Sequence, residues 1–290
     1  MIQLGATGLG ALALGGIVGG CSAEDSSEAS TVPQAEHRLQ PLFPRDIAFL
    51  AAGTLSRMPY TLIDGEGVPL TTIDGPLTFD ISLEGQPVGD PIEVQVHDDG
   101  VPRAYLPLYA TLPTPGIYDV RTTYGGTGLV SQVQVYPADE VMQPLVGSVL
   151  PAAPTATRDQ TLDVDPICTL APECPFHGVN LEEAIGTGKP VVVLLATPAY
   201  CRTSACGPIL DLLVEQVGGR DDLTVIHSEV YKNPKAVPDL ADATLAPLPL
   251  AYDMLWEPSL FVTDAANTLV ARGDIVVDRV EMDQMLALAV

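Results

Sequence analysis

Six consecutive apolar residues, 191–196 (VVVLLA), constrain the fold of this chain more than any other segment. A half-exposed strand alternates apolar and polar residues, so an unbroken apolar run of this length is typical of a strand buried on both faces. Such strands lie at the centre of parallel sheets. Residues 209–217 have the apolar spacing of a helix and end at two glycines, and residues 223–230 form a second strand pattern. The C-terminal part of the chain is therefore predicted to be an α/β unit.

Two cysteines, Cys201 and Cys206, lie between the apolar run and the predicted helix. Cys206 stands where the helix should begin, and unpaired backbone N–H groups and the helix dipole stabilise a thiolate at that position. The loop between the two cysteines is long enough to close a disulfide. We predict that the Cys206 thiolate attacks a substrate disulfide and that Cys201 then resolves the mixed disulfide.

The order of predicted elements over residues 176–290 resembles the thioredoxin fold: a short helix, the apolar strand, the cysteines, a helix, a strand, a strand pair and a closing helix. Glu257-Pro258-Ser259, just before a strand, is similar to the turn in which that family places a cis proline facing its cysteine pair. The resemblance implies that Pro258 lines a substrate groove at the cysteines. Thioredoxins also carry a buried acid in the central strand, and residues 191–196 contain none.

Several side chains near the cysteine pair have two interpretations. Tyr200 and Trp256 are candidates to line the groove with Pro258, and Trp256 fits an apolar core equally well. Arg202 either favours a thiolate by its charge or is a solvated loop residue.

The thioredoxin motif Trp-Cys-Gly-Pro-Cys is only partly present, because Cys206-Gly-Pro is followed by Ile209 instead of a second cysteine.

A second resemblance covers only four residues. Thr203-Ser-Ala-Cys206 fits the Thr-x-x-Cys part of the peroxiredoxin motif, in which the hydroxyl orients a peroxide. The proline of that motif is displaced by one position, to Pro198, and peroxidase activity is therefore a minor alternative.

His227 falls in the middle of a predicted strand, and we interpret it as a packed histidine in preference to a metal ligand or base.

The first twenty residues carry no charge, and Cys21 follows them. The run is rich in glycine and ends in small residues, which favours a signal sequence over a membrane span. Val18-Gly-Gly-Cys21 resembles the lipobox of bacterial lipoproteins, which implies cleavage before Cys21 and a lipid on it. We predict a signal peptide at 1–20, a flexible tether at 21–40 and a lipid-anchored position on the bacterial cell membrane, facing outside the cytoplasm; a simple membrane anchor is the alternative.

Residues 41–138 contain short alternating segments, such as 77–83, 92–96 and 129–135, separated by turn pairs such as Asp-Gly and Pro-Gly. This pattern predicts an antiparallel β-sandwich. Tyr118, which follows a Pro-Gly turn, resembles the corner tyrosine of immunoglobulin-like folds, whose hydroxyl bonds back to the backbone. The predicted fold class is multidomain: an immunoglobulin-like sandwich followed by an α/β thioredoxin-like fold.

Residues 139–175 are rich in proline and are predicted to be a linker. With Cys21 assigned to lipid, the other four cysteines form two local pairs most simply, and disulfides persist in exported proteins. We therefore predict a structural Cys168–Cys174 disulfide that pins the linker to the following domain. A redox pair and a metal site with the nearby His177 are the alternatives, but no further ligand with matching spacing is recognisable.

The chain carries 37 acidic and 13 basic residues, a formal net charge of −24. Such a surface repels phosphates, so nucleic acid is excluded as a partner. The sequence predicts extracytoplasmic thiol–disulfide exchange on the thiols or disulfides of exported proteins, without a metal or other cofactor. The main alternative is not an enzyme: a surface-anchored binding or scaffold module in which Cys201–Cys206 is a permanent disulfide.

Overall fold

The structure is a computed structural model that describes residues 36–290 of the chain. The predicted signal peptide, Cys21 and residues 21–35 of the predicted tether lie outside these residues. All described residues belong to one compact unit. None of the described helices combines the length and the apolar character needed to cross a membrane.

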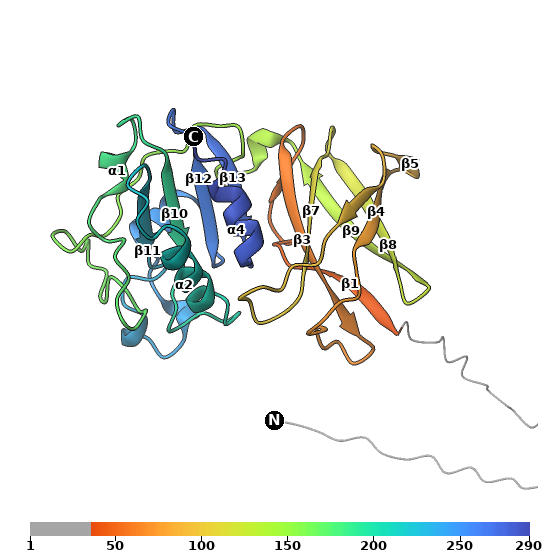
Figure 1. The fold of residues 1–290 in the computed structure, drawn as a ribbon, viewed down its shortest axis with the longest axis horizontal. Coiled ribbons are helices and arrows are strands. Elements are labelled where there is room, and N and C mark those ends of the chain that lie inside the picture. The colour runs from red at the N-terminus through yellow and green to blue at the C-terminus, as the bar shows by residue number, and fades with distance from the viewer. Residues whose placement is uncertain (1–35) are drawn as a thin grey trace, which may run out of the picture. The chain divides into compact units, whose positions relative to one another are not determined.

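Residues 37–136 form two sheets of mostly antiparallel strands (Figure 1). The first sheet has the order β1-β3-β7 and contains β1 (His37–Pro41), β3 (Leu55–Asp64) and β7 (Leu106–Thr111). The second has the order β2-β9-β8-β4-β5 and contains β2 (Leu50–Ala51), β4 (Leu77–Leu83), β5 (Gln86–Pro87), β8 (Gly116–Tyr124) and β9 (Thr127–Tyr136), with β6 (Ile92–Val94) paired to β4. The predicted sandwich is confirmed. It begins earlier than predicted, because β1 includes residues 37–40 of the predicted tether.

The alternation of β9 shows why these residues form a sandwich. Leu129, Val133 and Val135 are buried, while Val130 and the two glutamines between them face outward. The inward residues of both sheets meet in one apolar core that includes Tyr60, Phe79 and Leu108. The corner tyrosine is also confirmed, since the Tyr118 hydroxyl donates to the Thr114 carbonyl at 2.8 Å and accepts from the Thr114 N–H at 3.2 Å.

The C-terminal unit contains a four-stranded sheet with the order β11-β10-β12-β13. Its strands are β10 (Val191–Leu195), β11 (Thr224–Ser228), β12 (Ser259–Thr263) and β13 (Leu269–Asp274). Strand β11 is parallel to β10, whereas β12 and β13 run antiparallel to their neighbours β10 and β12. The helices are α1 (Leu181–Ala184), α2 (Cys206–Gln216), α3 (Pro247–Ala251) and α4 (Arg279–Leu286), with 3₁₀ turns at Ala138–Glu140, Pro234–Ala236 and Leu240–Asp242. All five residues of β10 are buried, as the apolar run predicts.

The proline-rich segment between the sandwich and α1 is an ordered part of the C-terminal unit. The N–H of Gly147 bonds to Leu269 O at 2.8 Å, and the N–H of Leu150 bonds to Asn267 O at 2.9 Å. Leu150 itself is fully buried against the sheet. This segment therefore lies along the free edge of β13 and satisfies backbone groups there.

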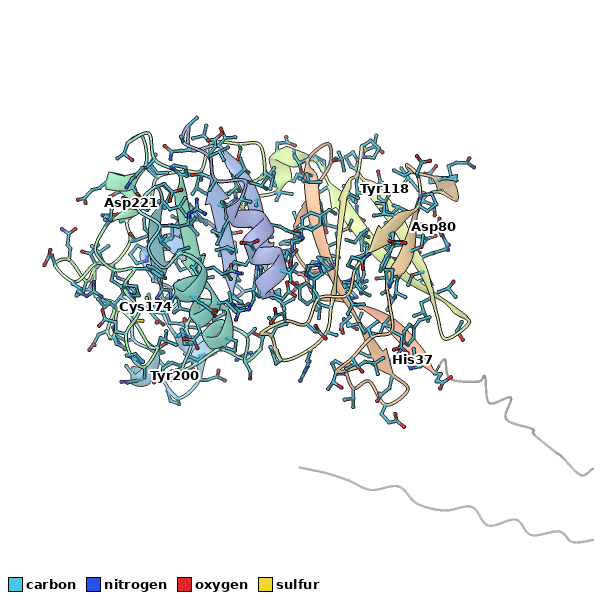
Figure 2. All side chains as sticks on the ribbon, viewed as in Figure 1. His37, Asp80, Tyr118, Cys174, Tyr200 and Asp221 are labelled. Atoms are coloured by element: carbon cyan, nitrogen blue, oxygen red, sulfur yellow. A yellow bond between two sulfur atoms is a disulfide. The ribbon has the colours of Figure 1, made fainter. Side chains whose placement is uncertain are left out.

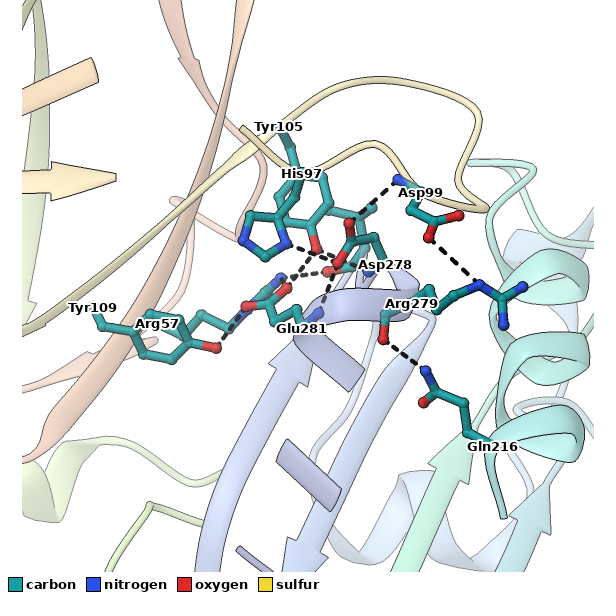
Figure 3. Close-up of polar contacts among 10 residues, drawn as sticks. Arg57, His97, Asp99, Tyr105, Tyr109, Gln216, Asp278, Arg279 and Glu281 are labelled. Atoms are coloured by element: carbon teal, nitrogen blue, oxygen red, sulfur yellow. Dashed lines mark hydrogen bonds and ion pairs between the residues drawn. The ribbon is translucent and has the colours of Figure 1, made fainter. Parts of the chain in front are cut away.

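A buried polar network joins the sandwich to the C-terminal unit (Figure 3). Arg57 of β3 donates to both carboxylate oxygens of Glu281 in α4, each at 2.6 Å. Tyr105 and Tyr109 of the sandwich donate to the same carboxylate. Because burial of a charge is costly unless it is paired and hydrogen-bonded, this complete set of partners fixes how the two parts meet.

A second part of the same network lies at the start of α4. Asp278 caps α4 by accepting from the Glu281 N–H at 2.8 Å, and its carboxylate also lies 2.7 Å from His97 Nδ1 of the sandwich. Arg279 pairs with Asp99 at 3.5 Å. The start of α4 is thus held by two side chains of the sandwich, His97 and Asp99 (Figure 3).

Candidate functional site

A disulfide joins Cys201 to Cys206 at the start of α2, with 6.0 Å between the two Cα atoms. This local pair is confirmed. Cys206 is the first residue of α2, and no side chain caps that end of the helix. Free backbone N–H groups and the positive end of the helix dipole therefore act on the Cys206 sulfur.

The two sulfurs differ in how far solvent reaches them. Cys206 is fully buried, because α2 packs its first turn against the sheet, whereas Cys201 is only half-buried. The Cys201 sulfur lies 3.1 Å from the Thr203 hydroxyl oxygen. Solvent therefore reaches the Cys201 sulfur more easily than the Cys206 sulfur. This burial does not favour the predicted order, in which Cys206 attacks first, and that order stays a prediction.

A buried carboxyl group lies beside the pair. A Glu257 carboxylate oxygen is within 4.8 Å of both sulfurs. Its Oε2 accepts the backbone N–H of Thr197 at 2.5 Å. Burial raises the pKa of Glu257 to about 7, although the Thr197 hydrogen bond opposes the shift. The sequence did not predict this acid, because the resemblance to thioredoxins placed a buried acid in the central strand. The glutamate immediately before Pro258 was the feature that could have indicated it.

Two of the predicted groove residues adjoin this site along the chain: Pro258 directly follows Glu257, and Tyr200 directly precedes Cys201. The Glu257–Pro258 peptide bond is cis, as predicted. Tyr200 is half-buried in the turn before Cys201, and its N–H bonds to Thr197 O at 2.9 Å; Figure 2 marks it in the C-terminal unit. Arg202 is exposed and pairs with Asp239 at 3.5 Å, which supports its interpretation as a solvated loop residue.

A pocket of about 590 Å³ opens beside the disulfide loop. Arg202, Thr203 and Ser204 line it from the loop, and Pro102 and Arg103 line it from the sandwich. The pocket borders the loop between the two cysteines, but neither cysteine is among its lining residues. Both parts of the described chain contribute to it.

Trp256 packs where the sandwich meets the C-terminal unit. Its ring packs against Phe49 of the sandwich, with centroids 5.4 Å apart, and its Nε1–H donates to Asp274 at 2.9 Å. It lines a separate pocket together with Phe43 and Ile47. Of its two interpretations, the structure supports packing between the sandwich and the C-terminal unit.

The predicted Cys168–Cys174 disulfide is absent from the structure, in which both thiols are buried and free. Both sulfurs lie close to His227 of β11, at 3.7 Å and 3.4 Å from its Nδ1. His177 Nε2 lies 3.3 Å from the Cys174 sulfur and 3.2 Å from His227 Nδ1. Figure 2 marks Cys174 in the C-terminal unit.

Four side chains, Cys168, Cys174, His177 and His227, form one cluster. A metal site at the first three was an alternative interpretation of the sequence, which did not predict that His227 joins them. The four ligand atoms all lie within 4.8 Å of one another. His227 is buried, as its interpretation as a packed histidine requires, but its ring faces two thiols and a second imidazole. The first signal in the sequence was His177, three residues after Cys174; the fourth member is far away along the chain.

Comparisons with known proteins do not show a family for this chain. No protein-family model matches this chain, and no curated protein matches it. Among solved structures, a titin Ig tandem is 13% identical over 36% of this chain and 50% of its own length, with a TM-score of 0.23. The titin M3 domain is 20% identical over 34% of this chain and 97% of its own, with a TM-score of 0.19. A twitchin kinase fragment from C. elegans, with immunoglobulin domains, is 12% identical over 36% of this chain and 20% of its own, with a TM-score of 0.20. Scores this low carry no argument about this chain.

Proposed function

We propose that this protein is a thioredoxin-like thiol–disulfide exchange protein that acts outside the cytoplasm through the Cys201–Cys206 pair. One observation carries the proposal: a half-buried cysteine is bonded to a buried one at the start of a helix, with the Glu257 carboxyl within 4.8 Å of both sulfurs. The strand order β11-β10-β12-β13, with α2 leading away from the pair, resembles the arrangement of a thioredoxin core and supports it.

The exchange step uses the two cysteines in a fixed order. A substrate thiolate attacks the Cys201 sulfur, a mixed disulfide forms, and the Cys201–Cys206 bond breaks with its electron pair going to Cys206. A second substrate thiolate then attacks the substrate sulfur of the mixed disulfide and releases Cys201 as a thiolate. The substrate leaves as a disulfide, having lost two electrons to the pair. In the reverse direction the Cys201 thiolate attacks a substrate disulfide, and Cys206 resolves it.

Glu257 moves the proton in this scheme. When Cys206 leaves as a thiolate inside the protein, the neutral Glu257 carboxyl donates a proton to it, and in the reverse direction the carboxylate takes that proton back. A pKa of about 7 suits an acid that must work in both directions near neutral pH. The start of α2 stabilises the Cys206 thiolate in the interval before protonation.

The partners we propose are the thiols and disulfides of exported proteins, which approach through the pocket beside Arg202 and Ser204. Because electrons pass directly between sulfur atoms, the reaction requires no further cofactor. We also propose attachment to the bacterial membrane through a lipid on Cys21, which places the pair in a compartment where disulfides persist.

The reduction potential of the Cys201–Cys206 disulfide tests the proposal. We expect a value between about −270 and −120 mV, the range of exchange proteins, measured by equilibration with glutathione buffers and mass analysis of the peptide that contains both cysteines. A value below about −300 mV would identify a permanent disulfide, and the protein would then be a surface binding or scaffold module.

A trapping experiment tests the order of the two cysteines. The Cys206→Ser variant should form a stable mixed disulfide with a small aromatic disulfide probe at Cys201 within seconds to minutes. The matched Cys201→Ser variant keeps only the buried Cys206 of the pair, and we expect trapping at Cys206 to be at least roughly tenfold slower, because burial blocks the attack. Equal rates in the two variants would refute the proposed order.

A further inference from the structure

We propose that Cys168, Cys174, His177 and His227 form a buried, four-coordinate zinc site. It is separate from the Cys201–Cys206 pair, and its role is to hold the segment before α1 against β11. The proposal starts from the convergence of four ligand atoms within 4.8 Å of one another, described above.

The spacing of the ligand atoms matches that of a tetrahedral zinc ion. Zinc binds thiolate sulfur at about 2.3 Å and imidazole nitrogen at about 2.0–2.1 Å, which at tetrahedral angles separates sulfur from nitrogen by about 3.6 Å and nitrogen from nitrogen by about 3.3 Å. In the structure three of the four sulfur–nitrogen distances are 3.3, 3.4 and 3.7 Å, and the nitrogen–nitrogen distance is 3.2 Å. These four distances are close to those expected around a tetrahedral zinc ion.

The chemistry of the four ligands favours zinc as well. Two thiolates and two imidazoles are soft and borderline donors, a set that zinc prefers and that magnesium and calcium do not. Two thiolates also balance the charge of a divalent ion, so no net charge is buried. All four ligands come from the protein and lie in a buried place, which is the form of a structural site, without an open position for a substrate.

A hydrogen bond fixes His227 in the tautomer that can bind a metal ion through Nδ1. Its Nε2 lies 2.9 Å from the Ala196 carbonyl oxygen. A carbonyl oxygen only accepts, so Nε2 carries the proton and Nδ1 presents its lone pair to the cluster. A backbone carbonyl that orients a ligating imidazole in this way is the usual outer partner of a zinc histidine.

The fold positions the cluster where it can order the surroundings of the disulfide. The backbone N–H of His227 bonds to Phe176 O at 3.1 Å, so the cysteine segment lies along β11. Thr169, next to Cys168, accepts the N–H of Ala199 at 3.1 Å, and Ala199 lies in the turn that leads to Cys201. A bound ion would thus hold the cysteine segment on β11, the task predicted for a Cys168–Cys174 disulfide. Through Thr169 it would also support the turn that leads to Cys201.

Metal analysis of the whole chain tests the site. Protein prepared under reducing conditions, incubated with Zn²⁺ and desalted should carry one zinc ion per chain by mass spectrometric metal analysis. The double variant Cys168→Ser/Cys174→Ser should lose it. The matched double variant Cys201→Ser/Cys206→Ser should keep one zinc ion per chain, because the pair near Glu257 is not part of this site.

Cobalt gives a readout that does not depend on how a variant folds. Co²⁺ added to the reduced wild-type chain should produce the intense visible bands of tetrahedral cobalt and a thiolate-to-metal charge-transfer band, and added Zn²⁺ should remove both. Reduced wild-type protein that takes up neither metal would overturn the proposal. Loss of zinc in the Cys201→Ser/Cys206→Ser variant would overturn it too, since the metal would then belong to the other pair.

Discussion

Glu257 holds its carboxyl group in a buried position next to the Cys201–Cys206 disulfide. A buried acid that accepts only one backbone hydrogen bond is poorly compensated when ionised, which is why burial raises its pKa to about 7 from an ordinary value of 4.5. We therefore expect two measurable effects of this residue, one on the proposed exchange reaction and one on stability.

Replacement of Glu257 by glutamine should slow exchange. The amide keeps the shape of the side chain but cannot pass a proton to or from Cys206, so we expect a loss of roughly 100-fold, the low end of what proton transfer contributes. The rate of wild-type protein should also show a step near pH 7 that the variant lacks. Rates with a dithiol substrate from pH 5 to 9 measure both effects; an unchanged pH profile would show that Glu257 plays no part.

The same substitution should change how stability depends on pH. Since the folded-state pKa of Glu257 is raised, its protonated form is favoured by folding; this contribution is complete below about pH 4.5 and is lost as the pH rises through about 7. The free energy of unfolding of the wild type, relative to Glu257→Gln, should therefore fall by roughly 2–3 kcal/mol between pH 5 and pH 8. Urea unfolding at both pH values measures the difference, and a constant difference would contradict the shift.

At the scale of elements, α4 depends on a close approach to β13. A Cβ at Gly273 of β13 would lie 2.5 Å from Val277 Cγ2 and 3.1 Å from Met285 Cε. Both of these side chains belong to the turn and helix that cover the strand. The glycine is thus required by packing, and not by an unusual backbone angle.

The Gly273→Ala substitution should destabilise the protein by about 1–3 kcal/mol, the usual effect of overpacking a filled core. Gly128→Ala in β9 is the matched control, since a Cβ there has no atom within 4 Å. Urea unfolding of both variants at pH 7 gives the comparison. A Gly273→Ala variant as stable as the control would mean that α4 shifts easily on the sheet.

At the scale of the whole molecule, the buried Arg57–Glu281 pair fixes the contact between the sandwich and the C-terminal unit. Arg57, Tyr105 and Tyr109 hydrogen-bond to the Glu281 carboxylate, and together they lower its pKa despite the burial that opposes the shift. Because the folded-state pKa is lowered, this carboxylate contributes stability above its ordinary pKa, and the contribution is lost as the pH falls through the folded value.

Glu281→Gln should cost about 3–5 kcal/mol of unfolding free energy at pH 7, because it leaves the Arg57 charge buried without its partner. Asp119→Asn, in an exposed ion pair with Arg121, is the control and should change stability by less than about 1 kcal/mol. If Glu281→Gln behaves like this control in urea unfolding, the interface is not held by its charges.

The predicted lipid anchor is also a property of the whole molecule, and it lies outside the described residues. We expect the full chain, expressed in a bacterium, to sediment with the membrane fraction, and Cys21→Ser to remove it from that fraction. The stability of the rest of the chain should not change. A Cys21→Ser variant that stays with the membrane would favour the alternative, an uncleaved membrane anchor.

The sequence by itself determined the elements whose pattern is local. The apolar run 191–196 predicted buried β10, the helical spacing after the cysteines predicted α2 with Cys206 at its start, and alternation with turn pairs predicted the sandwich. These predictions hold because a period of two or of 3.6 residues is set by which face of a single element is buried. The local Cys201–Cys206 disulfide was accessible for the same reason, since its two ends are close along the chain.

Only the tertiary structure decided what surrounds those elements. Burial of Cys206 and exposure of Cys201 depend on how α2 packs, and Glu257 reaches the pair from a distant turn. Cys174 meets His227 across a separation of 53 residues, and Arg57 meets Glu281 across 224. The periodicity of a single element cannot predict such contacts, because each contact depends on how the whole core places two separate elements. Cys168 and Cys174 were therefore paired with each other from their spacing alone, when folding directs both of them to a histidine on β11.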